Sequence, residues 1–307
     1  MLFKNKEYVL YKEGSKMLGN RELNYNFVRA VDNGNIEKAK QLLLNGADVN
    51  AKGEILEDTA LQIATERGNM KMVELLLAQP NIENDFESLQ NALYNGYGNV
   101  ARKILEHKPE LAKMAIDGEN PLQSSILTGD KNLISDLIPL LIKYGADVNI
   151  RNENGRTPLH LAAHHGLRDA CALLLKQEGI IVDAADKKGY TPLHHAASAG
   201  KIGCCRILLE KGADPERTVK DKNIIDLCNN LYPNKAELLK DTIKKVEAQK
   251  LRKRKVQDNE VAIDQESSLS DSEEQPKEKK VKKWAEEEDK RLVNNGAVKV
   301  SRGVNTF

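Results

Sequence analysis

A seven-residue motif occurs twice, in register, in the second half of the sequence. Residues 157–163 read Thr-Pro-Leu-His-Leu-Ala-Ala, and 34 residues later residues 191–197 read Thr-Pro-Leu-His-His-Ala-Ala. A second motif, Gly-Ala-Asp-Val-Asn, occupies residues 46–50 and 145–149 and returns more loosely at residues 212–215. One unit of such a repeat cannot bury its apolar face alone and buries it against its neighbours. The sequence therefore predicts a stacked, repeating fold rather than one closed globular core.

Glycines give the spacing of the other, less regular repeats. One glycine follows each predicted first helix, at Gly34, Gly68, Gly96, Gly129, Gly166 and Gly200. An aliphatic pair lies eight and nine residues beyond most of these glycines, at residues 42–43, 76–77, 104–105, 174–175 and 208–209. Each pair is expected to face the neighbouring repeat. The count gives six repeats, followed by a degenerate seventh around residues 223–227.

The two motifs together resemble the ankyrin family, whose repeat of about 33 residues carries Thr-Pro-Leu-His on its first helix. The resemblance covers roughly residues 24–245. It implies an all-α ankyrin-repeat solenoid of helix-turn-helix repeats with β-hairpin finger loops, followed by a disordered charged tail. The expected domains are an N-terminal extension over residues 1–23, an ankyrin-repeat domain over residues 24–250 that ends in a capping repeat, and the tail over residues 251–307.

The motif residues suit a scaffold. The threonine hydroxyl caps free backbone amides at the helix start, and the proline occupies a position whose N–H has no helical partner. The leucine points into the core, the paired alanines let helices approach closely, and the glycine ends the helix. In the Gly-Ala-Asp-Val-Asn turn, Asp and Asn are expected to bond back to the backbone. Asn50 and Asn149 also resemble the ankyrin asparagines accepted by the asparaginyl hydroxylase of the hypoxia pathway, although a turn role is the leading interpretation.

Repeats two to four depart from the motif. Glutamine stands where the motif has histidine, at Gln62, Gln90 and Gln123. Only 28 residues separate Gly68 from Gly96, so residues 79–85 are predicted to lack a full hairpin finger. The second helix of repeat four, which contains Pro139, is predicted to be about one turn longer, because four extra residues precede the next turn.

The end of the solenoid needs a polar outer face, because an exposed apolar end would aggregate. Asn234 and Glu237 resemble a capping box at the start of a last helix. Beyond them an apolar stripe consists of Leu239, Ile243 and Val246. Residues 234–250 are therefore predicted to form the closing helix. The residues beyond it are polar and poor in aromatic side chains, which predicts disorder.

Composition agrees with a solenoid and bears on the compartment. Aromatic residues make up 4% of the chain and charged residues 30%, whereas most globular cores rely on large aromatic side chains. The net charge of +1 weakens any case for wholesale nucleic-acid binding. The N-terminus carries charges where a signal peptide has its apolar run, and the four cysteines include no CxxC pair. No stretch is apolar enough to span a membrane. The expected compartment is the cytoplasm, with the nucleus as the alternative.

The histidines and cysteines are interpreted as scaffold residues rather than metal ligands. His160 and His194 belong to the repeated motif, in which imidazole bonds the backbone between repeats. Cys171 and Cys205 occupy the same repeat position, on stacked helices too far apart for a disulfide. The sequence contains no metal-ligand spacing, phosphate-binding loop or nucleophile elbow. We therefore expect no enzymatic activity, no metal and no cofactor.

The tail offers two basic runs and an acidic serine cluster. Residues 250–256 and 277–283 each resemble a nuclear-import signal. The centre of the first run is formed by Arg252, Lys253, Arg254 and Lys255. Ser268 and Ser270 each have an acidic residue three places on, as at an acidophilic kinase site, and phosphates there would add negative charge beside the basic runs. A tail that is simply solvated is the alternative.

The predicted function is a protein-interaction scaffold or adaptor that binds a partner protein through the concave surface of the solenoid. The resemblance implies contacts at the finger tips and at the exposed ends of the first helices. The predicted contact residues at the helix ends are Glu66, Arg67, Tyr94, Asn95, His164 and His165, and those on the fingers are Glu153, Asn154, Arg156, Lys187, Lys188 and Tyr190. Neither a small-molecule substrate nor a membrane is expected. The alternative is a nuclear or nucleic-acid-associated regulator that acts through the basic tail.

Overall fold

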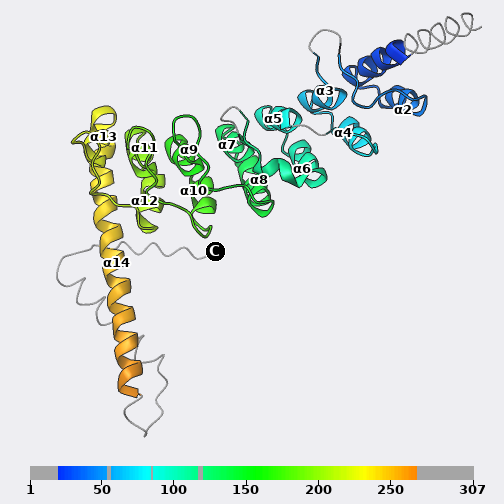
Figure 1. The fold of residues 1–307 in the computed structure, drawn as a ribbon. Coiled ribbons are helices and arrows are strands. Elements are labelled where there is room, and N and C mark those ends of the chain that lie inside the picture. The colour runs from blue at the N-terminus through cyan, green and yellow to red at the C-terminus, as the bar shows by residue number, and fades with distance from the viewer. Residues whose placement is uncertain (1–19, 54–56, 84–85, 117–119, 268–307) are drawn as a thin grey trace, which may run out of the picture. The chain divides into compact units, whose positions relative to one another are not determined.

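The structure is a computed structural model that describes residues 20–53, 57–83, 86–116 and 120–267, with side chains as far as residue 257 (Figure 1). The chain divides after Lys240 into two compact units. The first unit contains the repeats, and the second contains most of the last helix.

The first unit is a double row of short helices. Each repeat pairs a first with a second helix: residues 20–32 with α2 (Ile36–Leu44), α3 (Ala60–Glu66) with α4 (Met70–Leu77), α5 (Phe86–Tyr94) with α6 (Gly98–His107), α7 (Pro121–Leu127) with α8 (Lys131–Lys143), α9 (Pro158–His165) with α10 (Arg168–Leu174), and α11 (Pro192–Ser198) with α12 (Ile202–Glu210). A short 3₁₀ helix, η1 (Pro109–Lys113), follows α6, and α13 (Ile224–Leu231) and α14 (Pro233–Ser267) close the series.

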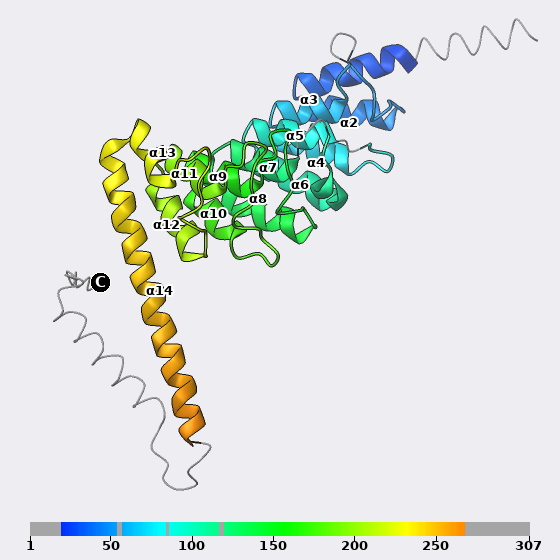
Figure 2. The ribbon, with the colours of Figure 1, turned by 60° about the vertical axis from the view of Figure 1, so that its left-hand side comes forward.

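Helices of the same kind stack on one another. The first helices pack in sequence from α3 through α5, α7, α9 and α11 to α13, and the second helices pack from α2 through α4, α6, α8 and α10 to α12 (Figures 1 and 2). This arrangement confirms the predicted all-α solenoid. The finger loops between repeats are turns with little strand pairing: within the described ranges their isolated bridges join Lys52 to Thr59 and Val219 to Lys222. Residues 79–83 likewise form only turns, which agrees with the short third repeat.

The aliphatic pairs of the second helices form the core between repeats. The pairs at residues 76–77, 104–105, 174–175 and 208–209 are buried, as expected for side chains that face the next repeat. The pair at residues 42–43 is only half-buried. It lies on α2, the first member of its row among the described helices, so α4 covers it from one side only. Burial of these pairs therefore depends on the neighbouring repeats.

Threonine and its partner three residues on cap the first helices. The backbone N–H of Thr157 donates to Nδ1 of His160 at 3.0 Å, so Nε2 carries the proton and donates to the carbonyl of Tyr190 at 3.0 Å. One imidazole thus completes a capping box and also joins repeat five to repeat six. His194 does the same in repeat six, where its Nε2 lies 3.0 Å from the carbonyl oxygen of Arg217.

Glutamine reproduces these bonds in the earlier repeats. Oε1 of Gln62 accepts from the backbone N–H of Thr59 at 2.7 Å, and the two residues form a complete capping box. The amide of Gln123 donates to the carbonyl of Arg156 at 2.9 Å, the position that corresponds to Tyr190 in the next repeat. Glutamine thus makes the capping bond in repeat two and the bond to the next repeat in repeat four, without a titratable group.

The asparagines of the Gly-Ala-Asp-Val-Asn turns also join neighbouring repeats. The side chain of Asn50 donates to the carbonyl of Asn81 at 2.7 Å and accepts from the N–H of Glu83 at 2.9 Å. Asn149 makes the corresponding pair of bonds to Gly179 and Ile181, at 2.9 and 3.0 Å. Both side-chain amides thus bond to the backbone of the next repeat, which agrees with the predicted structural role of these asparagines.

Repeat four has the lengthened second helix that the spacing predicts. Helix α8 contains 13 residues and includes Pro139, whereas α10 and α12 contain 7 and 9. The apolar face of α8 stays buried along its length, through Leu133, Leu137 and Leu141. The extra turn is therefore accommodated without loss of the stacking surface.

The prediction for the last helix is wrong in its bounds. Helix α14 begins at Pro233, so Asn234 lies inside the helix, and the helix continues to Ser267 rather than ending at residue 250. Residues 251–267 contain neither glycine nor proline and are rich in good helix formers, so nothing stops propagation. The predicted disorder is thus corrected for residues 251–267, while residues 268–307 lie outside the described part of the chain.

Candidate protein-binding surface

The exposed ends of the first helices form one row across the repeats. The residue two places before the repeat glycine is Glu66 in repeat two, Tyr94 in repeat three, Leu127 in repeat four and His164 in repeat five. All four side chains are exposed, and Tyr94 and Leu127 show 51% and 49% of their surface. Leu127 is absent from the predicted contact residues, although the glycine spacing that selects Tyr94 and His164 also selects it.

The character of this row changes along the solenoid. Near its start, Arg67 forms an exposed ion pair with Asp32 at 2.7 Å, next to Glu66. In the next two repeats the row contains the half-exposed side chains of Tyr94 and Leu127. Next to Tyr94, the side-chain amide of Asn95 donates to the backbone carbonyl of Asn91 at 2.8 Å. The same backbone position therefore presents acidic, aromatic, aliphatic and imidazole groups in successive repeats.

The finger loops that precede α9 and α11, finger five at residues 152–156 and finger six at residues 186–190, are bonded to each other. Glu153, Asn154, Lys187 and Lys188 are all exposed. The backbone N–H of Lys187 donates to the carbonyl of Asn154 at 3.0 Å, so the two fingers are bonded to each other. Gly155 permits this approach, because it has φ +74° and a Cβ there would lie 2.9 Å from the nitrogen of Lys187. The two fingers are thus held in fixed register before any partner binds.

A cluster of aromatic rings connects the finger base to the helix end. We call His160, His164, His165, Tyr190, His194 and His195 the ring cluster. The ring of His195 lies 5.4 Å from that of His160, 5.8 Å from that of His164 and 6.0 Å from that of Tyr190. His164 in turn lies 5.3 Å from His165. The predicted residues Tyr190, His164 and His165 therefore belong to one surface, joined by His195, which is not among the residues predicted from the sequence.

A buried carboxylate holds this cluster in place. Oδ2 of Asp186 accepts from Nε2 of His195 at 2.9 Å, and Oδ1 accepts from the backbone N–H groups of Lys188 and Tyr190, each at 2.9 Å. Nε of Arg156 lies 3.8 Å from Oδ2. Burial raises the pKa of Asp186, but the bonds from His195 and the two amides outweigh it, so the pKa lies below its usual value. The carboxylate is only 3% exposed and is fully used inside the repeat.

Two predicted contact residues therefore also have scaffold roles. The side chain of Arg156 is 33% exposed and pairs with Asp186. The ring of Tyr190 is half-buried and packs edge-on against His194 at 5.9 Å. Substitution of either residue would disturb the fingers as well as the surface. Lys187, Lys188, Tyr94 and Leu127 are the cleaner positions for a binding test, because their side chains are exposed.

The surroundings of His164 are cationic. Burial lowers the pKa of His164, and the neighbouring charges of His165, Arg156 and Lys201 lower it further. Burial also lowers the pKa of His195, against the opposing effect of its bond to Asp186. Both shifts favour the neutral form of the imidazole, and the permanently charged groups near the end of α9 are Arg156 and Lys201.

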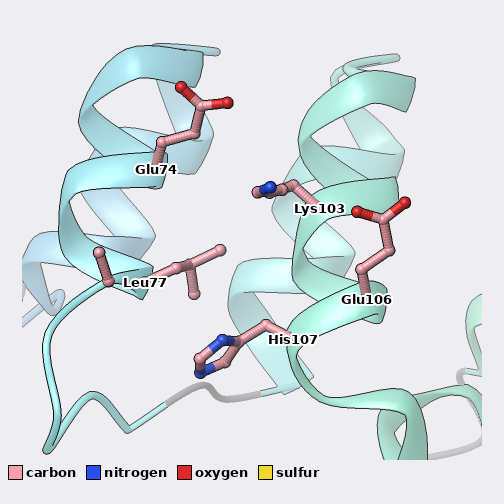
Figure 3. Close-up of a pocket in the computed structure, with 6 residues that line it drawn as sticks. Glu74, Leu77, Lys103, Glu106 and His107 are labelled. Carbon is pink, nitrogen blue, oxygen red and sulfur yellow. The ribbon is translucent and has the colours of Figure 1, made fainter.

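A separate hollow lies on the second-helix side. It has a volume of about 400 Å³ and is lined by Glu74, Leu77, Ala78, Lys103, Glu106 and His107. Figure 3 shows Lys103 and His107 of α6 pointing into the gap toward α4. Groups of both signs surround the hollow, and it contains none of the predicted contact residues. The hollow therefore adds nothing to the proposed surface.

The cysteines and titratable groups of the described residues form no metal-binding cluster. The four cysteines are free and buried, and burial raises the pKa of the Cys205 thiol. In the described ranges no group of three or more His, Cys, Asp or Glu side chains could hold a metal ion. Among the same residues, no helix has the length and apolar character that crossing a bilayer requires.

The basic run of residues 252–255 lies within α14. Lys253, Arg254 and Lys255 are exposed and Arg252 is half-buried, so the predicted import signal is part of a continuous helix. Ser268 and Ser270, the predicted phosphorylation sites, lie outside the described residues, as does the second basic run at residues 277–283.

Comparison with known proteins identifies the repeat. A family model described as "Ankyrin repeats (3 copies)" matches residues 27–115 and 126–219. An ankyrin repeat protein of Rickettsia felis is 34% identical over 117 residues, which is 35% of this chain and 51% of that protein. Protein phosphatase 1 regulatory subunit 27 of Homo sapiens is 36% identical over 92 residues, 30% of this chain and 57% of that protein.

A third relative shows the same partial match. Ankyrin repeat domain-containing protein 63 of Mus musculus is 36% identical over 93 residues, 29% of this chain and 23% of that protein. The chain thus spans little more than half the length of the first two relatives and less than a quarter of the third. The similarity lies in the repeats that these proteins share.

Proposed function

Because the chain belongs to the ankyrin-repeat family, we propose that it is an adaptor that holds a partner protein on the row of first-helix ends and on fingers five and six. Ankyrin repeats are protein-interaction modules, and a solenoid presents an extended surface suited to that task. A relative described as a phosphatase regulatory subunit supports a binding role rather than catalysis. The four buried, unpaired cysteines favour a reducing compartment such as the cytoplasm or nucleus.

One observation carries this proposal. The scaffold residues of each repeat are alike and buried, whereas the residue two places before the glycine changes its chemistry from repeat to repeat. Tyr94 and Leu127, in adjacent repeats, keep about half of their surface in water. Glu66 and His164 occupy the same position in other repeats, so the repeat does not need an apolar side chain there, and neighbouring exposed apolar groups mark interaction sites. Aromatic residues in particular often dominate binding energy.

The test compares two double variants of the full chain in affinity capture from cell lysate. Tyr94→Ala with Leu127→Ala is expected to reduce capture of the parent's partner about tenfold or more, because each loss removes an apolar contact. The control, Leu44→Ala with Ile181→Ala, removes similarly exposed apolar groups elsewhere on the solenoid and should capture as the parent does. Both variants should melt like the parent. Equal capture by the two variants would contradict the assigned surface.

A further inference from the structure

The proposed surface has a cationic end. The basic side chains on fingers five and six, and on the turn at residues 219–222 that we call finger seven, are Arg156, Lys187, Lys188, Lys220 and Lys222, and Lys201 lies at the start of α12. Glu153 and Asp221 are the exposed acidic side chains at the finger tips, and Asp147, Glu178, Asp214 and Glu216 are exposed nearer the start of the same loops. The carboxylate of Asp186 is enclosed by its bonds and is 3% exposed, so it does not face a partner. At the finger tips, the four exposed lysines Lys187, Lys188, Lys220 and Lys222 therefore outnumber the two exposed acids Glu153 and Asp221.

These cations lie close enough together to act on one ligand. Arg151 donates to the carbonyl of Ala185 at 2.7 Å, and Arg217 donates to the carbonyl of Asp183 at 3.2 Å, so basic side chains bond neighbouring finger loops to each other. The bond from Lys187 to Asn154 fixes the lysine-bearing finger against finger five. Positive groups held together at fixed positions attract a ligand with several negative charges, and the attraction weakens as salt rises.

The neighbouring part of the row is apolar. Leu127 and Tyr94 lie one and two repeats before His164, at the same position of their repeats. Stacked helices lie about 8–10 Å apart, and an extended chain advances about 3.3 Å per residue. Finger six lies two repeats beyond Leu127 and three beyond Tyr94, about 16–30 Å along the stack, so an extended segment of about five to nine residues could place an apolar side chain on one of them and carboxylates on Lys187 and Lys188.

We propose that the partner segment bound here is an acidic stretch of protein with an apolar side chain beside it. The carboxylates contact Lys187 and Lys188, and the apolar side chain packs on Tyr94 and Leu127. This inference rests on the proposed adaptor function and adds the chemistry of the partner. The lysine and imidazole groups of this surface can donate hydrogen bonds to the backbone carbonyls and carboxylates of a bound protein segment. The apolar side chains of Tyr94 and Leu127 favour binding of a protein segment over binding of a nucleic-acid strand.

The test measures fluorescence anisotropy of the full chain with three labelled probes. The first is a peptide of Glu and Asp with one Leu, the second replaces each acid by its amide, and the third is a single-stranded DNA oligonucleotide of equal charge. We expect the acidic peptide to bind about tenfold or more tightly than the amide peptide and the oligonucleotide. Its affinity should fall as salt is raised.

Charge-reversal variants locate the binding. Lys187→Glu with Lys188→Glu should weaken the acidic peptide about tenfold or more. Lys176→Glu with Lys211→Glu makes the same charge change at exposed lysines that follow the second helices of the same two repeats, and should alter binding by less than about twofold. If both variants lose the same affinity for the acidic peptide, the loss follows from net charge rather than from the position of the lysines, and the inference is wrong.

Two further outcomes separate this inference from the proposed function. If the amide peptide or the oligonucleotide binds as tightly as the acidic peptide, the partner chemistry is wrong, whereas the adaptor function still stands if capture depends on Tyr94 and Leu127. If capture does not depend on these two residues while the acidic peptide binds the lysine fingers, the cationic site is supported and the proposed surface fails.

Discussion

Replacement of Leu174 by alanine is expected to lower the free energy of unfolding by about 2–5 kcal/mol. Leu174 is the last residue of α10 and is fully buried. Helix α10 packs against α8 on one side and α12 on the other, so the lost side chain leaves a cavity between three repeats. Because a solenoid is held together by such interfaces, the effect spreads beyond repeat five.

Urea unfolding, followed by circular dichroism, measures this prediction. The matched control is Leu44→Ala, which makes the same chemical change at a side chain that is 81% exposed. The control should change the free energy of unfolding by no more than about 0.5 kcal/mol. If the two variants are equally stable, the aliphatic pairs do not form the core between repeats and the packing described above is wrong.

Lowering the pH from 7 to 4 is expected to reduce the free energy of unfolding by about 3 kcal/mol through protonation of His160 alone. Burial is the main cause that lowers the pKa of His160 to about 4, from the usual 6.5 of an exposed histidine. The bond to the carbonyl of Tyr190 and the charge of Asp186 oppose this shift, and the charges of His195 and Arg151 add to it. The unfolded chain therefore binds the proton first. The stability is fully present above pH 6.5 and is lost as the pH falls to about 4.

The sequence provides its own control for this prediction. His160→Gln copies the bonds that Gln62 and Gln123 make in earlier repeats, without a titratable ring. The variant should be close to the parent in stability at pH 7 and should lose about 3 kcal/mol less between pH 7 and pH 4. Urea unfolding curves of the parent and the variant at pH 7 and pH 4 measure this difference. An unchanged pH dependence in the variant would show that His160 is not the acid-sensitive cap.

The regular parts of the fold follow from local rules that the sequence displays. Thr157 and Thr191 cap helices, and the turn asparagines join repeats, because these roles depend on residue type and spacing within one repeat. The end of α14 does not follow from such a rule. Low apolar content predicts that a segment lacks a core, but residues 251–267 also lack a helix-breaking residue, and the structure continues the helix through them.

The candidate surface was only partly accessible to sequence reasoning. The glycine spacing identifies the exposed ends of the first helices, and in repeat four it identifies Leu127, two residues before Gly129. The roles of Arg156 and Tyr190 depend on Asp186, which precedes Tyr190 in its finger but follows Arg156 by 30 residues. Contacts of that kind cross from one repeat to the next, so a motif within one repeat does not reveal them.

Hydrogen–deuterium exchange of the full chain, with and without the partner captured from lysate, tests the binding surface most directly. We predict slower exchange on fingers five and six, at residues 152–156 and 186–190, and in the turns that follow α5, α7 and α9. Exchange in the second helices α4, α6 and α10 should stay unchanged, because they lie in the other row. Protection confined to these second helices, with the fingers and first-helix ends unaffected, would contradict the account.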